Sequence, residues 1–157
     1  MFGLFKKIKN NYKNIGKGRI LSLQEVPDEI FSKNMLGEGY AVDLIDGVVK
    51  SPIDGDVIVA FASNHAFGIK DKNGIEVLIH LGINTVRLNG EGFYSDIKQG
   101  DHVKAGDVLA KMDLEKIKAS GYSTITPVIF TSGQKIELLK HHQEADANTT
   151  EIFKFKK

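Results

Sequence analysis

The sequence predicts a single all-β domain, an antiparallel β-sandwich or barrel-like fold with a few short helical turns. The 157 residues are 41% hydrophobic and 26% charged, which is typical of one globular domain. Short runs rich in Val, Ile and Phe recur along the chain, as in antiparallel sheets. Gly and Asp separate these runs in stretches such as DG, NG and KQGD, which favours tight turns over alternating strands and helices.

The predicted strands follow one another from Arg19 to the end of the chain. In order they are RILSL, YAVDLI, GVVKSP, GDVIVAF, HAFGIK, EVLIHL, DHVKAGDVLAKMD, TPVIFT and EIFKFK. Each is short and rich in apolar residues, and most are flanked by turn-forming residues. Two further stretches, residues 113–119 and 134–142, are predicted as short helices.

The amino-terminal segment differs from the rest in charge. Residues 1–19 contain six basic residues and no acid, so the remainder, with 15 basic and 20 acidic residues, carries a net charge of −5. Apolar residues recur there at helix-like spacings: Met1, Phe2, Leu4, Phe5, Ile8 and Tyr12. The segment is therefore either a weak amphipathic helix for an anionic membrane surface or a partner, or a solvated arm. We predict a tail over residues 1–17, a hinge at Gly16 to Gly18, and a folded domain over residues 18–157.

Composition also excludes several classes of protein. The chain has no cysteine, so it has no disulfide and no thiolate metal site. No stretch is long enough for a membrane span, and the start lacks the apolar core of a secretory signal, so we expect a cytoplasmic protein. An acidic domain repels nucleic acid and favours a basic protein partner.

Two histidines are predicted to meet on one hairpin. FASNHAFGIK and GIEVLIHLGI flank KDKNG, which is rich in turn formers. A four-residue loop places His65 opposite His80, and a two-residue turn places Phe67 opposite His80 with His65 on the diagonal. Either register puts both histidines on one face with Ser63, Phe67 and Leu78, at Cβ separations of roughly 5 to 8 Å.

The pattern alone leaves the role of the pair open. A buried structural histidine is the plainest interpretation. A metal site would need a third ligand that no spacing reveals, and acyl transfer by Ser63 would need a nucleophile-elbow motif that is absent. Phosphoryl transfer is also possible, with one imidazole as the nucleophile and the second as a hydrogen-bond donor.

Several motifs together resemble one known family. HLGINTVRLNGEGF, SNHAFGIK, EVPDEIF, SPIDGDV and TPVI occur in the order and spacing of the glucose-class enzyme IIA of the bacterial sugar phosphotransferase system, over about residues 18–157. The resemblance implies an antiparallel β-sandwich of the duplicated hybrid motif type. It also implies a phosphoryl carrier without cofactor or metal, which accepts phosphate from the histidine phosphocarrier protein and passes it to a cysteine of a IIB domain. Some members of the family regulate other proteins through the same face.

The resemblance also assigns roles to residues. It makes His80 the phosphoacceptor through Nε2, with the Gly82 carbonyl holding Nδ1, and makes His65 the stabiliser of the phosphoryl group. Ser63 stands where the family usually has a threonine that orients His65. The implied docking surface for partners consists of Asp28, Ile30, Phe31, Met35, Leu36, Phe61, Leu78, Asn84 and Val86.

Asn84 departs from the family, which commonly has aspartate at this position. Loss of that charge can weaken the steering of a basic partner or ease the approach of a dianionic phosphoryl group, and the sequence leaves both effects open.

Other functions are retained as alternatives. The first is a zinc-dependent hydrolase with a LytM-like β fold, in which His65 and His80 are metal ligands. The second is an interaction module that binds partners without phosphoryl transfer. KQGDHVKAGDVLAKMD also suggests a biotinyl or lipoyl carrier, but it lacks the lysine of their modification hairpin.

Overall fold

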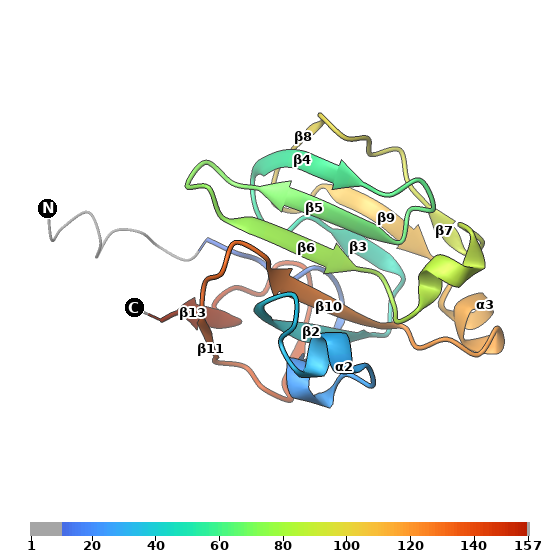
Figure 1. The fold of residues 1–157 in the computed structure, drawn as a ribbon, viewed down its shortest axis with the longest axis horizontal. Coiled ribbons are helices and arrows are strands. Elements are labelled where there is room, and N and C mark those ends of the chain that lie inside the picture. Colours follow the sequence, from blue (N-terminus) through green and yellow to red (C-terminus); the bar gives the residue numbers. More distant parts are fainter. Residues whose placement is uncertain (1–10, 157) are drawn as a thin grey trace, which may run out of the picture.

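One large antiparallel sheet holds eight of the strands, in the order β12-β1-β2-β10-β6-β5-β4-β8. The structure is a computed structural model and describes residues 11–156. Figure 1 shows β4, β5, β6 and β10 side by side across the sheet. The strands are β1 (Gly18–Ser22), β2 (Glu38–Leu44), β4 (Gly55–Ala60), β5 (Ala66–Lys70), β6 (Glu76–His80), β8 (His102–Val103), β10 (Ile125–Phe130) and β12 (Glu144–Ala145).

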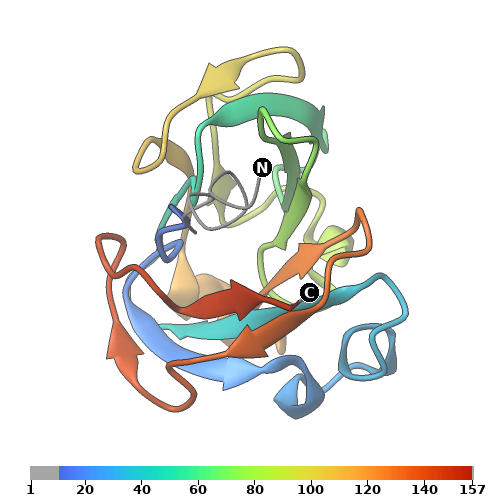
Figure 2. The same cartoon turned by 90° about the vertical axis from the view of Figure 1, so that its left-hand side faces the viewer.

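Two smaller antiparallel sheets complete the fold. One has the order β3-β9-β7 and the other pairs β11 with β13. Figure 1 shows β3 and β9 behind β5 and β6, and Figure 2 shows the strands from the side, surrounding a common interior. The five strands are β3 (Val48–Lys50), β7 (Phe93–Tyr94), β9 (Val108–Met112), β11 (Ile136–Leu138) and β13 (Phe153–Phe155). The predicted all-β antiparallel sandwich is confirmed.

Strand alternation decides which residues fill the core. In β6, Val77 and Ile79 are fully buried in the main core, while Leu78 and His80 lie on the opposite face of the sheet. Residues of β3 and β9 share this core, so burial of apolar surface joins the small sheet to the large one. The outer face around β6 is therefore free to carry function.

The helical segments among residues 11–156 are short, as the sequence predicts. They are η1 (Leu23–Glu25), α2 (Glu29–Ser32), η2 (Thr85–Leu88) and α3 (Leu114–Ala119). α3 coincides with the predicted helix, and its cap Asp113 accepts a hydrogen bond from the Lys116 N–H. The sequence does not predict α2, because a single four-residue turn is too short to show helical periodicity.

The second predicted helix, over residues 134–142, is wrong. Ile136 and Leu138 instead belong to β11, opposite Phe155 and Phe153 of β13. His142 has a φ of 63°, in the left-handed region that ends any right-handed helix. The apolar positions that suggested a helical face alternate along a strand.

The predicted boundary between tail and domain also needs correction. Tyr12 and Ile15 are buried in the main core, and the Tyr12 hydroxyl donates a hydrogen bond of 3.0 Å to Asp71 Oδ2. Gly18 is part of β1 and pairs with Leu44 of β2, so Gly16 to Gly18 do not form the predicted hinge. The folded part thus begins no later than Tyr12. The rest of the predicted amphipathic tail, residues 1–10, lies outside the described residues. None of the helices described is long and apolar enough to cross a membrane.

Candidate functional site

The β5–β6 hairpin has neither of the two predicted registers. Ala66 lies opposite His80, and Gly68 lies opposite Leu78. The Asp71 N–H donates to the Ile75 carbonyl, which leaves a three-residue loop over residues 72–74. Its last residue is a glycine with a φ of 84°, as three-residue hairpin loops commonly require. Both predicted registers, with loops of two and four residues, are wrong.

The two histidines nevertheless approach each other closely. Their ring centroids lie 5.4 Å apart with the rings nearly perpendicular, so the predicted juxtaposition is confirmed. Strand alternation does not bring them together, because His65 precedes β5 and lies in the β4–β5 turn. Asn64 there has a φ of 57°, and this left-handed residue breaks the alternation just before His65. Phe67, predicted on the same face, points into the core and is fully buried.

His80 is held in one tautomer by the backbone. Its Nδ1 lies 2.7 Å from the Gly82 carbonyl oxygen, and because a carbonyl only accepts, Nδ1 must carry the proton. The lone pair is then on Nε2. Gly82 has a φ of 79°, and a Cβ there would lie 2.6 Å from Thr85 Cγ2 and 2.7 Å from the Ser123 carbonyl oxygen. Glycine is therefore required at this position, both by conformation and by space.

His65 is held by a side chain. The Ser63 hydroxyl lies 2.5 Å from His65 Nδ1. A hydroxyl that donates to Nδ1 leaves the ring proton on Nε2, where it is available to a ligand. The geometry thus allows one ring to offer a lone pair and the other to offer an N–H.

The surroundings keep both rings neutral. Burial lowers the pKa of His65, and the neighbouring His80 lowers it further. Burial also lowers the pKa of His80, against the opposing effects of the Gly82 carbonyl and the Asp28 carboxylate. Both imidazoles are therefore unprotonated at neutral pH, as a nitrogen nucleophile needs to be.

These lowered pKa values predict a pH dependence of stability. Below the usual histidine pKa of about 6.5, the unfolded chain binds protons that the native chain refuses, so the free energy of unfolding falls as the pH falls. The limit is about 1.4 kcal/mol per pH unit for each such proton. We expect the double variant His65→Gln/His80→Gln to lose less stability than the wild type between pH 7.5 and 5.5 in urea denaturation. Equal losses in the two proteins would contradict the assigned pKa directions.

Apolar side chains surround the pair on the outer face. The Phe31 ring centroid lies 5.2 Å from that of His80, and the Phe61 centroid lies 5.1 Å from that of His65. Figure 1 shows α2 below the ends of β6 and β10. The predicted docking residues that are exposed apolar groups, with exposures from 43% for Leu36 to 67% for Met35, are Ile30, Met35, Leu36, Phe61 and Val86.

The remaining predicted docking residues have other environments. Phe31 is buried in a second apolar cluster with Ile129, so it supports the surface from beneath and cannot line it as predicted. Leu78 is half-buried beside this cluster. Asp28 caps α2 through the Ile30 N–H. Asn84 is exposed with a φ of 60°, a conformation that asparagine tolerates well.

Three residues of the site, Val59, Gly68 and Thr126, are not among the predicted site residues. Val59 is partly exposed and lies opposite Gly68 of β5, which in turn lies opposite Leu78 of β6. Because glycine has no side chain, the surface between Val59 and Leu78 is shallow. A register shift between Val57 and Val59 interrupts the alternation that would have placed it. Thr126 is fully buried, and its hydroxyl accepts a hydrogen bond of 3.4 Å from the Gly82 N–H, although 44 residues separate them.

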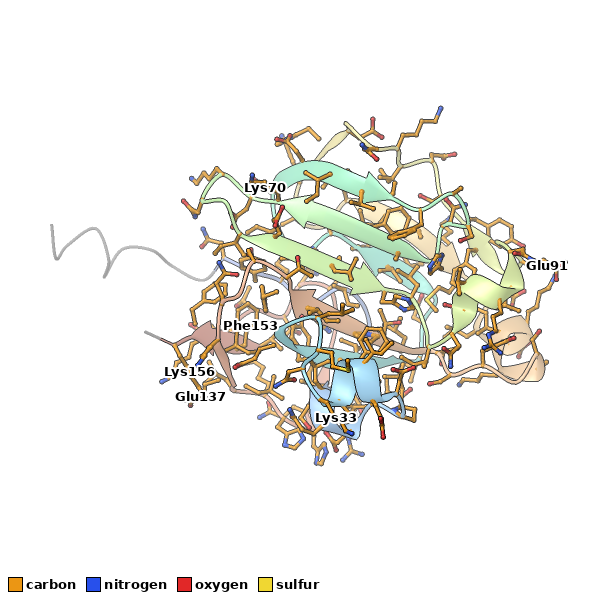
Figure 3. The ribbon with its side chains drawn as sticks, viewed as in Figure 1. Lys33, Lys70, Glu91, Glu137, Phe153 and Lys156 are labelled. Carbon is orange, nitrogen blue, oxygen red and sulfur yellow. The ribbon has the colours of Figure 1, made fainter. Side chains whose placement is uncertain are left out.

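Basic and acidic side chains lie around the apolar face. Figure 3 shows Lys33 directly after α2, where it pairs with Glu29 at 3.4 Å, and Lys70 at the end of β5 that is remote from His80. Among residues 11–156, the convergent group of metal-ligating side chains is Glu25, His141 and His142, and it includes neither His65 nor His80. The predicted zinc-hydrolase alternative therefore lacks a third protein ligand within the described part of the chain.

Comparison with known proteins agrees with this geometry. The family model for the phosphoenolpyruvate-dependent sugar phosphotransferase system, EIIA 1, matches residues 11–136. The glucose-specific EIIA component of Bacillus cereus is 46% identical over 123 residues, which cover 78% of this chain and 74% of that protein. The glucosamine-specific EIICBA component of Bacillus subtilis is 47% identical over 127 residues, which cover 81% of this chain and 20% of that protein. The glucose permease IIA from Mycoplasma capricolum has 34% identity and a TM-score of 0.80, with 92% of both chains covered.

Proposed function

The chain belongs to the EIIA 1 family of the phosphoenolpyruvate-dependent sugar phosphotransferase system, and we propose that His80 is the residue that carries its phosphoryl group. The protein is a phosphoryl carrier of that system. The strongest support for the choice of His80 is its hydrogen bond to the backbone. Its Nδ1 proton is donated to the Gly82 carbonyl at 2.7 Å, so Nε2 carries the lone pair and is the nucleophile.

The proposed reaction consists of two displacements at phosphorus. Nε2 of His80 attacks a phosphohistidine of the donor protein, and a new N–P bond forms as the donor's N–P bond breaks. The electron pair of the broken bond returns to the donor imidazole. In the second step a cysteine thiolate of the acceptor attacks the phosphorus, and the bond to Nε2 breaks in turn.

His65 is proposed as the electrostatic partner in both steps. With Ser63 at its Nδ1, its Nε2–H can donate to a phosphoryl oxygen held between the two rings, whose centroids are 5.4 Å apart. A fixed donor in a site with little water stabilises the charge that develops on the phosphoryl oxygens. The apolar side chains around the pair limit access of water to the labile N–P bond.

The proposed partners are the histidine phosphocarrier protein as donor and a IIB domain as acceptor. Relatives from Bacillus subtilis named EIICBA and EIIBCA components join an EIIA part to B and C parts in one chain, which supports a IIB partner. The exposed apolar side chains Met35, Phe61 and Val86 provide a surface on which such partners can dock. We place the exchange in the cytoplasm, because phosphoenolpyruvate is an intracellular metabolite.

The sugar is proposed to be of the glucose class. Relatives of this chain carry names specific for glucose, glucosamine and β-glucosides. A carrier passes on only the phosphoryl group, so its own site holds no sugar and the transporter's other domains choose among these substrates.

Incubation with a phosphorylated histidine phosphocarrier protein tests the proposed function. Intact-mass analysis should show a gain of one phosphoryl group, and the modification should be labile in acid and stable in alkali, as phosphohistidine is. A chain that stays unmodified under conditions that phosphorylate a related glucose-specific EIIA component would contradict the proposal.

Ser63→Ala is expected to separate the two steps of transfer. Loss of the hydroxyl leaves the proton of His65 free to move to Nδ1, which removes the donor at Nε2. We expect acceptance of phosphate to fall by less than about threefold and transfer to the IIB cysteine to fall by about tenfold, since one lost charge-assisted hydrogen bond corresponds to roughly 1.5 kcal/mol.

Ser63→Thr is the matched control, because it restores the hydroxyl and should restore transfer in the same rapid-quench assay. Equal losses in the alanine and threonine variants would show that the hydroxyl has no part in transfer.

A further inference from the structure

We propose that Glu25, His141 and His142 form a binding site for a divalent transition metal ion, with zinc as the preferred ligand among common cellular ions. The three side chains come from η1 and from the turn between β11 and β12. One potential ligand atom from each residue lies within 4.8 Å of the others. The sequence predicts no metal at these residues, and no short motif joins them, since Glu25 and His141 are 116 residues apart.

Both histidines present the same nitrogen to one carboxylate. Nε2 of His141 lies 2.7 Å from Glu25 Oε2, and Nε2 of His142 lies 2.5 Å from Glu25 Oε1. The centroids of the two rings lie 3.8 Å apart, with the ring planes tilted by 37°. Because a carboxylate only accepts hydrogen bonds, each Nε2 carries the ring proton in this arrangement. A zinc ion, with bonds of about 2.0 to 2.2 Å to imidazole nitrogen and carboxylate oxygen, would replace these two hydrogen bonds, and each ring proton would move to Nδ1 or to solvent.

The backbone fixes both sides of this group. The Glu25 carboxylate accepts hydrogen bonds from the Ser22 N–H and hydroxyl in a capping box at the start of η1. The turn that carries the histidines is tied to β1, where the His142 N–H donates to the Ile20 carbonyl. The ligands are thereby largely preorganised, which lowers the entropic cost of binding.

The donor set suits a borderline-soft cation. Two imidazoles and one carboxylate match the three protein ligands of many zinc sites and leave a fourth position for water or a partner group. Calcium and magnesium prefer oxygen ligands and are poorly served by this group.

A bound ion would connect distant parts of the chain. Glu25 lies at the end of η1, which leads directly into α2 and its exposed Ile30, whereas the histidines follow β11. Binding to the native chain alone stabilises that chain by mass action. The site shares no side chain with His65 and His80, so metal binding and phosphoryl transfer are separable.

Zinc chloride and a chain without a polyhistidine tag test this proposal. Titration calorimetry should give one zinc ion per chain, and cobalt(II) should give the visible absorption of a tetrahedral complex. The melting temperature should rise with zinc and should not change with magnesium. The double variant His141→Gln/His142→Gln should reduce zinc affinity at least about tenfold and abolish the cobalt spectrum.

Two control variants locate the binding. His102→Gln, at another exposed histidine beside a carboxylate, should leave zinc affinity unchanged. His65→Gln/His80→Gln should also leave it unchanged. Retention of stoichiometric zinc by the His141/His142 variant, or its loss from the His65/His80 variant, would overturn the proposal. Normal phosphoryl acceptance by His141→Gln/His142→Gln would show that this variant is folded.

Discussion

Replacing His80 with alanine should abolish phosphoryl acceptance. The substitution removes Nε2, whose lone pair is available because the Gly82 carbonyl holds the ring proton on Nδ1. His65 cannot take the place of His80 in the same geometry. The His65 ring is linked at Nδ1 to Ser63, and its Nε2 serves as a donor in the proposed mechanism. We therefore expect no detectable gain of mass when His80→Ala is incubated with the phosphorylated histidine phosphocarrier protein.

His65→Ala is the informative partner experiment. It leaves the nucleophile and its backbone anchor intact, so the variant should still gain one phosphoryl group. Transfer to the IIB cysteine should then be slower by a factor of roughly 100, since a positioned donor to phosphoryl oxygens contributes about 2.7 to 4 kcal/mol in comparable sites. Labelling that disappears in His65→Ala but persists in His80→Ala would exchange the two roles.

Stability must be separated from chemistry in this comparison. His80 is half-buried beside Phe31, so its truncation also removes packing. His80→Gln retains most of the volume and offers an amide that can reach the Gly82 carbonyl. A folded His80→Gln protein, as judged by circular dichroism, that accepts no phosphate would assign the loss to the missing nucleophile.

The strands were predictable because their signals are local. Apolar runs bounded by Gly and Asp identified most of β1 to β10. The helix predicted over residues 134–142 is wrong because Ile136 and Leu138 fit a helical stripe as well as a strand. Only the pairing of β11 with β13, a contact between segments distant in the chain, decides the outcome.

In the candidate site, too, local signals were predictable and contacts between distant segments were not. The sequence predicts that His65 and His80 meet, through strand alternation across a hairpin. The actual reason is a left-handed Asn64 in the preceding turn together with a three-residue loop at the other end of β5. Tyr12 was similarly assigned to a tail, because its burial depends on contacts with Phe153 and Asp71 that no short stretch of sequence reveals.

Gly82→Ala should be among the most damaging single-atom additions near the site. The new Cβ would lie 2.6 Å from Thr85 Cγ2 and 2.7 Å from the Ser123 carbonyl oxygen, and the φ of 79° disfavours alanine independently. We expect a loss of at least about 3 kcal/mol in the free energy of unfolding, of which a left-handed alanine accounts for about 1 to 2 kcal/mol and overpacking for the rest. Urea denaturation at pH 7.5 measures it.

Gly74→Ala separates these two causes. Gly74 has a similar φ of 84°, but a Cβ there would meet nothing within 4 Å, so this variant reports the conformational cost alone. We expect it to lose about 1 to 2 kcal/mol and to accept phosphate normally. Gly82→Ala should in addition slow acceptance by about tenfold in its folded fraction, because a displaced Gly82 carbonyl no longer fixes the tautomer of His80. If the two variants lost equal stability and accepted phosphate equally fast, neither the tight packing at Gly82 nor its carbonyl would matter to the site.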